Sequence, residues 1–398
     1  MTHVQAHSIS PRPTSQSWGL VVIAVALLAV GLVAVASASS SYDRPMLGQA
    51  IWRMPFGRQA VFALIGFGLM LSTEKLGARL LDSSWACKWL PLAGIVMTVA
   101  ALAVTLIADP HRGSQRWLRV APGSAFELSF QPSEIAKITL LAFLAAWLGG
   151  RDAAPRSFWR GLFVPALVLG ATVLLVGSED FGTASLLTGV GGLLLFVAGC
   201  RLRYLFPLMI VGVAVLVVLL LIEPYRLERL KAHDTLWSDP RGAGYQPLQS
   251  LTTIASGGWL GLGLGEGVQK HGYLPESHTD FVFSIVCEET GMVGGGLVLA
   301  LFCGLICLGW QTFRAAPTMF ERLLAFGLTA MIGCQAAMNI AVVTAVTPTK
   351  GISLPFVSAG GSGTLTFCIA IGLLAAIATR RAGSERRTFS APVWEVPE

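Results

Sequence analysis

The chain has 398 residues, of which 54% are hydrophobic and only 13% are charged, with a formal net charge of +6. A soluble domain carries roughly 25% charged residues, so this composition excludes a water-soluble globule of this size. The basic residues lie in short clusters between apolar runs, without a stripe interleaved with aromatic residues, which argues against nucleic-acid binding.

Ten apolar stretches follow one another along the chain, most of them close to the roughly 20 residues that a membrane-spanning helix needs. The first is too long for the apolar core of a signal peptide and is predicted to be a retained span. The sequence therefore predicts an all-α polytopic membrane protein with about ten transmembrane helices, forming one membrane domain over 18–380 between tails at 1–17 and 381–398. The predicted spans are 18–38, 59–72, 87–108, 132–148, 159–176, 183–199, 205–222, 291–310, 323–346 and 364–379.

Ten spans would place both termini on one side of the membrane. The short connections on that side carry Arg79, Lys88, Arg151, Arg156, Arg160, Arg201, Arg203, Arg314 and Arg322. By the positive-inside rule this side is the cytoplasm, so both termini are predicted to be cytoplasmic. Two connections on the opposite side are long, 109–131 and 223–290, and the second is the one large extracytoplasmic loop. Long loops in compact proteins usually have a function, so we expect the chemistry there.

Five short motifs carry most of the polar residues outside the apolar runs. They are GSQRW (113–117), QPSEIAK (131–137), EDFGT (179–183), YLPESHTDF (273–281) and PTKGISLPFVSAGG (348–361). In this order on a ten-span frame they resemble the SEDS family (shape, elongation, division and sporulation proteins) from the first span to the last. The segment 348–351 resembles the division and sporulation members more than the elongation members. Ala359 and Gly363 depart from the family pattern, which usually has Tyr and Ser there.

The resemblance implies a peptidoglycan glycosyltransferase that polymerises lipid II at the outer face of the cytoplasmic membrane, at the division septum. It also implies a class B penicillin-binding protein as partner, together with other division proteins. Two alternatives are a lipid II flippase or other transporter, and a non-catalytic recruiter of the penicillin-binding protein. Transporter sites lie near the membrane midplane, whereas the motifs here cluster at the outer face, which favours the enzyme.

Asp280, at the end of the large loop, is the predicted general base. A carboxylate at the lipid–water boundary is partly desolvated, which raises its pKa and makes it a better proton acceptor. The resemblance also implies a catalytic aspartate at this position. The alternative is that Asp280 is the N-cap of the apolar helix that follows, because Asp is a preferred cap.

Lysines in two motifs are candidates for binding the substrate's pyrophosphate. Lys137 lies three residues after Glu134, on one face of a predicted helix. This pair is either a salt bridge, with Glu134 also capping the helix, or a site in which Lys137 contacts pyrophosphate or the pair tunes Asp280. Lys350 lies in a loop whose main-chain N–H groups could approach a phosphate; alternatively the loop is only a tight re-entrant turn.

The remaining candidates have weaker signals. Trp117 is either an interfacial anchor or an aromatic face for sugar or isoprene, with Arg116 near phosphate. His278 is either a second titrating group or a bystander, and Glu276 of the same motif is a supporting residue.

Two sets of acidic residues are candidates for binding a cation. Glu179 and Asp180 are expected to be a solvated surface pair, with cation binding as the alternative. A divalent cation, Mg²⁺ or Mn²⁺, is expected because such ions commonly accompany pyrophosphate chemistry, with Asp280 and Glu134 as candidate ligands.

Overall fold

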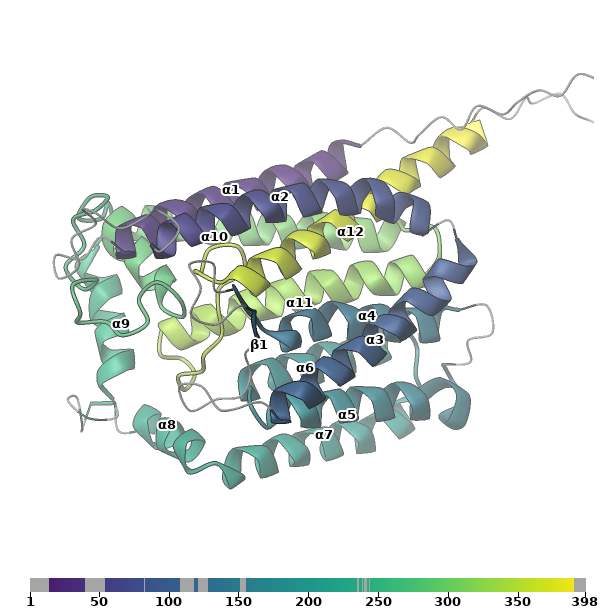
Figure 1. Ribbon diagram of the computed structural model, residues 1–398, viewed down its shortest axis with the longest axis horizontal. Helices are drawn as coiled ribbons and strands as arrows, with labels where there is room; N and C mark the ends of the chain where they lie inside the picture. Colours follow the sequence, from purple (N-terminus) through teal and green to yellow (C-terminus); the bar gives the residue numbers. More distant parts are fainter. Residues whose placement is uncertain are drawn as a thin grey trace, which may run out of the picture.

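The structure is a computed structural model that describes residues 14–39, 54–81, 83–107, 118–120, 128–150, 155–234, 236–237, 239, 242 and 244–389. Over these residues the chain forms a bundle of long helices, with two shorter helices across one end (Figure 1). The elements are α1 (Ser15–Ser39), α2 (Pro55–Leu80), α3 (Ser84–Ile107), β1 (Leu118–Val120), β2 (Leu128–Phe130), α4 (Pro132–Gly149), the π-helical turn η2 (Phe158–Phe163), α5 (Val164–Gly177), α6 (Phe181–Val197), α7 (Leu202–Ile222), α8 (Pro224–Asp234), α9 (Tyr245–Ser256), α10 (Val282–Ala315), α11 (Met319–Val343) and α12 (Gly361–Phe389).

Seven of the described helices are long and apolar enough to cross a membrane: α1, α2, α4, α7, α10, α11 and α12. Shorter apolar helices lie at the three remaining predicted positions, in α3, α5 and α6. The prediction of a polytopic, essentially all-helical membrane protein is thereby confirmed. The described strands, β1 and β2, form one short antiparallel pair. The number of helices that cross the bilayer stays a prediction.

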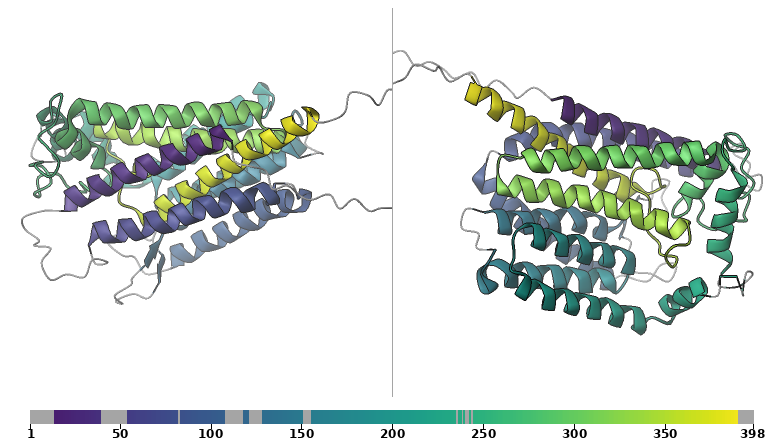
Figure 2. Two further views of the ribbon diagram at one scale, coloured as in Figure 1. Left: turned by 90° about the horizontal axis from the view of Figure 1, so that it is seen from above. Right: turned by 180° about the vertical axis from the view of Figure 1, so that it is seen from behind.

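The two ends of the described chain lie at the same end of the bundle, opposite α8 and α9 (Figures 1 and 2). At one end, the Gln16 amide of α1 donates to Gln311 of α10 over 2.9 Å. At the other end, Ser37 of α1 accepts from Lys270 over 2.9 Å. This arrangement agrees with an even number of spans, while the side that faces the cytoplasm stays a prediction. We call the end that holds α8 and α9 the loop end.

The interior of the bundle is formed by α4, α11 and α12. In the most apolar window of α12, 72% of the residues are buried, against 6% in α7, which lies at the periphery. Small residues allow the inner helices to approach closely, as is common in membrane proteins. At Gly372 of α12, an added Cβ would lie 2.5 Å from the Met70 carbonyl oxygen of α2. The contact between α2 and α12 therefore requires glycine at this position.

α10 is broken at Gly291, whose backbone angles (φ 68°, ψ −169°) are not helical. The predicted span 291–310 thus coincides with the second of two helical segments that meet at Gly291, while the first segment, from Val282, lies where the sequence predicted the end of the large loop. An added Cβ at Gly291 would lie 2.3 Å from the Trp259 carbonyl oxygen. Four main-chain hydrogen bonds between the loop 257–263 and α10 close the break. The loop donates two, from Leu262 N to Glu288 O (2.9 Å) and from Gly263 N to Glu289 O (3.1 Å), and α10 donates two, from Met292 N to Gly258 O (3.0 Å) and from Val293 N to Trp259 O (3.3 Å). They satisfy groups that the break would leave unpaired.

Candidate functional site

Asp280 lies in the turn that leads into α10, at the loop end, and is half-buried. The N-cap of α10 is Phe281, so the alternative assignment of Asp280 as the N-cap is wrong. Gly351 lies directly against the carboxylate, because a Cβ added there would be 3.3 Å from Asp280 Oδ2. The Asp280 side chain therefore borders the motif 348–361, which we call the PTKG loop.

Two amide side chains of α11 hold the Asp280 turn and the PTKG loop together. Asn339 Nδ2 donates to the Asp280 carbonyl over 2.8 Å and to the Ile352 carbonyl over 2.7 Å. Gln335 Nε2 donates to the Ser353 carbonyl over 3.0 Å. Gln335 and Asn339 are four residues apart and so lie on one face of α11. One rigid helix thus sets the position of both segments.

Glu134 and Lys137 form a buried ion pair on α4. Lys137 Nζ lies 2.7 Å from Glu134 Oε1, with side-chain exposures of 1% and 8%. Lys137 also donates to Gln335 Oε1 over 2.8 Å and lies 5.3 Å from the centroid of the Phe367 ring. The pair therefore connects α4 to the Gln335 amide that holds Ser353. This geometry favours the salt-bridge alternative, because the ammonium group is enclosed by protein.

Lys350 reaches from the PTKG loop to the first residue of α6. Its Nζ lies 5.2 Å from the centroid of the Phe181 ring, a cation–π distance. Burial lowers the pKa of Lys350 from its ordinary value of 10.5. Among the described residues, no carboxylate forms an ion pair with Lys350. The PTKG loop thus presents a half-buried cation, unpaired among the described residues, one residue before the glycine that borders the Asp280 carboxylate.

Asp180 is buried, so the expectation of a solvated acidic pair is wrong for this residue. It is the N-cap of α6, where its carboxylate accepts from Thr183 N (2.9 Å) and from Thr183 Oγ1 (2.9 Å). Gln131 Nε2 donates to the same carboxylate over 3.2 Å. The main-chain N–H of Gln131 in turn donates to Ser362 Oγ over 3.1 Å. Asp180 therefore joins the start of α6 to the starts of α4 and α12.

The structure places the other candidates as follows. The His278 carbonyl accepts from Ala359 N over 2.9 Å, so the His278 main chain borders the PTKG loop. Glu276 is exposed, has a positive φ of 52°, and accepts from Thr279 Oγ1 over 2.8 Å. Arg116 and Trp117 lie outside the described residues.

A second buried ion pair lies further along α10. Lys270 Nζ is 3.0 Å from Glu289 Oε1 and also donates to the Gly265 carbonyl over 2.6 Å. The neighbouring Glu288 accepts from two main-chain N–H groups, those of Val268 and Gln269. These contacts fix the segment before Asp280 to α10.

Sequence reasoning missed Gln335 and Asn339. Both are almost fully buried in an apolar span, where a polar side chain needs a partner and marks a functional or structural site. Their spacing of four residues was the available signal, but their acceptors are carbonyls of a distant loop, which no local pattern reveals.

The sequence of this chain is similar to one family of known proteins. A family model named FTSW_RODA_SPOVE and described as "Cell cycle protein" matches residues 18–383. A protein of Geobacter sulfurreducens named "Probable peptidoglycan glycosyltransferase FtsW" is 37% identical over 92% of this chain and 95% of its own length. "Stage V sporulation protein E" of Bacillus subtilis is 36% identical over 92% and 98%.

Two solved structures have the same architecture. One is a chain of the structure described as "Structural coordination of polymerization and crosslinking by a peptidoglycan synthase complex". It has a TM-score of 0.70 and 28% identity over 92% of this chain and 98% of its own length. Rod shape determining protein RodA of Thermus thermophilus gives a TM-score of 0.64 and 28% identity over 92% and 97%.

Proposed function

We propose that this chain, which belongs to the FtsW/RodA/SpoVE family of cell cycle proteins, is a peptidoglycan glycosyltransferase that polymerises lipid II. Relatives 37% identical to it carry that activity in their names. The observation that carries the proposal is the position of Asp280, whose carboxylate borders the open side of Gly351, next to Lys350, a cation without an ion-pair partner among the described residues. A base and a cation on adjoining segments suit glycosyl transfer from a diphosphate.

In this reaction a sugar hydroxyl of one lipid-linked saccharide attacks the anomeric carbon of another. A new carbon–oxygen bond forms, the bond to the diphosphate oxygen breaks, and the diphosphate leaves on its polyprenyl lipid. We assign the hydroxyl proton to the Asp280 carboxylate as general base. We assign Lys350 to the negative charge that develops on the leaving diphosphate, where a fixed cation stabilises the transition state.

Lys137 and Glu134 act as positioning residues in this scheme. Their mutual 2.7 Å contact and their burial leave the Lys137 ammonium facing Glu134, Gln335 and the Phe367 ring. The pair orients Gln335, and Gln335 holds the Ser353 carbonyl. The Glu134–Lys137 pair therefore affects catalysis by fixing the position of the PTKG loop.

A divalent cation remains part of the proposal. Among the described residues, no group of three or more His, Cys, Asp or Glu side chains could hold a metal ion. Glu134 is engaged by Lys137, which makes it a poor ligand. Mg²⁺ is commonly held by one or two carboxylates plus substrate phosphates, so Asp280 and the diphosphate oxygens would hold it and it would neutralise phosphate charge.

The protein is a multi-pass membrane protein, and a related chain functions in a peptidoglycan synthase complex. We propose that its partner is a class B penicillin-binding protein and that the pair works with other division proteins at the septum of the cytoplasmic membrane. The FtsW names of the relatives support the septal role. The loop end would then face outward, which a reporter tag at Thr235 tests: a cytoplasmic signal there would reverse the orientation.

The decisive experiment compares wild type with Asp280→Asn, each purified with its partner and supplied with labelled lipid II. Asn is nearly isosteric but is not a base at neutral pH, so strand synthesis should fall by about 10²–10⁴-fold. The matched control is Asp239→Asn, an exposed aspartate of the same loop, which should leave synthesis unchanged. Equal synthesis by Asp280→Asn and wild type would remove Asp280 from the mechanism. No strands from wild type would instead favour the flippase or recruiter.

A further inference from the structure

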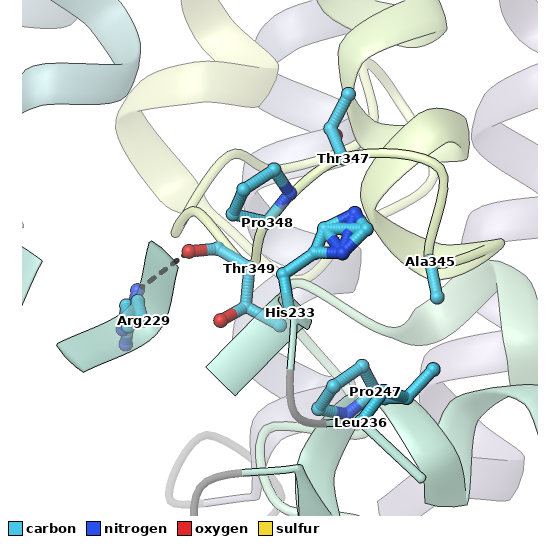
Figure 3. A pocket seen from close by; sticks show the side chains of 8 residues that line it. All are labelled: Arg229, His233, Leu236, Pro247, Ala345, Thr347, Pro348 and Thr349. Carbon is cyan, nitrogen blue, oxygen red and sulfur yellow. Dashed lines mark hydrogen bonds between the residues drawn. The ribbon is translucent and has the colours of Figure 1, made fainter. Parts of the chain in front are cut away.

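α8 crosses the loop end beside the PTKG loop. Arg229 Nη1 of α8 donates over 3.4 Å to the carbonyl of Thr349, the residue before Lys350 (Figure 3). His233, one turn further along α8, has its Nε2 3.4 Å from the Val346 carbonyl. A small pocket between the two segments is lined by both side chains and by residues 347–349. α8 is thus one wall of a pocket whose other wall includes Thr349, the residue before Lys350.

Arg226 explains why α8 lies in this position. Its guanidinium donates to the Leu219 carbonyl (2.6 Å) and the Ser178 carbonyl (2.7 Å), near the C-terminal ends of α7 and α5. Cations are favourable at helix C-termini, so the charge of Arg226 is compensated there. The same guanidinium lies 5.8 Å from the Phe181 centroid, on the ring that Lys350 also contacts. The Phe181 ring is therefore contacted both by α8, through Arg226, and by the PTKG loop, through Lys350.

Arg229 has no such compensation. Its guanidinium stacks on Tyr225, 4.5 Å from the ring centroid, and donates to the Tyr225 hydroxyl. Among the described residues, neither Arg229 nor Lys350 forms an ion pair with a carboxylate. Both are half-buried, where like charges are screened less than in bulk water. Arg229 contacts the residue next to Lys350, and two such cations that form no ion pair among the described residues favour a ligand that brings its own negative charge.

We infer that Arg229 of α8 is a second diphosphate-binding residue, which holds the polyprenyl diphosphate together with Lys350. This inference rests on the proposed function. A diphosphate carries more than one negative charge, and the planar guanidinium can donate two parallel hydrogen bonds to a phosphate, whereas an ammonium acts as a point charge. The stacking on Tyr225 fixes the guanidinium plane in advance, so α8 and the PTKG loop form the two sides of one anion site.

The test measures binding to purified protein of three lipids: undecaprenyl pyrophosphate, undecaprenol and phosphatidylglycerol. Arg229→Gln should weaken undecaprenyl pyrophosphate binding about tenfold or more, since a hydrogen bond to a charged group contributes about that much. Binding of undecaprenol should not change. The matched control is Arg203→Gln, because Arg203 likewise stacks on a neighbouring tyrosine, Tyr204, at 4.5 Å, but at the opposite end of α7.

Two results would overturn the inference: unchanged diphosphate binding by Arg229→Gln, or an equal loss for phosphatidylglycerol, which would make Arg229 a membrane-surface contact. If Arg229→Gln lowers the melting temperature, Arg229→Lys replaces it. The ammonium keeps the charge but not the fork of the guanidinium, so undecaprenyl pyrophosphate binding should then weaken severalfold while undecaprenol binding stays unchanged, and a wild-type affinity for undecaprenyl pyrophosphate would contradict the inference. The binding assay needs no turnover, so a wild type that makes no strands would reject the proposed function without altering this result.

Discussion

Lys137→Met tests whether the buried pair positions the PTKG loop or binds substrate. The substitution keeps a long, unbranched side chain but removes the cation from a pair whose members are 1% and 8% exposed. Glu134 would remain as a buried carboxylate, and its Oε2 already has no hydrogen-bond partner. Removing one partner of a buried ion pair costs about 3–5 kcal/mol in the free energy of unfolding. We therefore expect a clearly lower melting temperature and loss of strand synthesis.

The double variant Glu134→Gln with Lys137→Met separates the two interpretations. It removes both charges, so the buried carboxylate no longer exists and most of the stability should return, as replacing a whole buried pair is often neutral. Gln335 Oε1 loses its Lys137 donor, but the amide introduced at position 134 can donate to it instead, and Gln335 Nε2 would still donate to the Ser353 carbonyl. A positioning role therefore predicts that strand synthesis also returns in large part. The assay is thermal melting and lipid II polymerisation on the same preparations. Recovered stability without recovered synthesis would refute the positioning role and assign Lys137 to the substrate.

Three further predictions concern the same site. Gly351→Ala places a Cβ 3.3 Å from Asp280 Oδ2, so strand synthesis should fall by up to about a hundredfold with an unchanged melting temperature; normal synthesis would contradict the contact. Because burial lowers the pKa of Lys350, its charge is lost at a lower pH than in an ordinary lysine, so undecaprenyl pyrophosphate affinity should fall as pH rises through that pKa. Lys350→Arg should remove this dependence, and an identical pH profile would refute it. Thorough chelation should lower synthesis, with recovery on adding Mg²⁺ or Mn²⁺; unaffected activity would remove the metal and leave the Asp280 proposal intact.

Local sequence patterns predicted much of the fold because membrane helices depend on a local property. The apolar stretches coincide with ten described helices, since each span must be apolar over its own length. The Glu134–Lys137 pair was also predictable, because residues three apart share a helix face. The helical segment of α10 before Gly291 was not. Glu288 and Glu289 lower the hydropathy before Gly291, and their contacts with Lys270 and with the N–H groups of 268 and 269 come from a separate loop.

The site depended on contacts between distant segments, which explains the wrong expectation for Asp180. An acidic pair between two spans normally lies in solvent, yet the Asp180 carboxylate accepts from Gln131, 49 residues earlier in the chain. The resemblance to a known family supplied Asp280 and the PTKG loop, but it did not supply the α11 amides that hold them. Those amides could be recognised as unusual in an apolar span, while their acceptors required the fold.

Ala359 shows how the loop can lose a side chain without losing its shape. The contact between the PTKG loop and the Asp280 turn at this position is made by the main-chain N–H of Ala359, which donates to the His278 carbonyl over 2.9 Å. The next residue is held in the same way, since Gly360 N donates to Gln59 Oε1 over 3.1 Å. Neither hydrogen bond uses the side chain at 359. A tyrosine there, as the family resemblance would suggest, could add contacts of its own, but the backbone geometry that places Gly351 against Asp280 does not depend on a phenol.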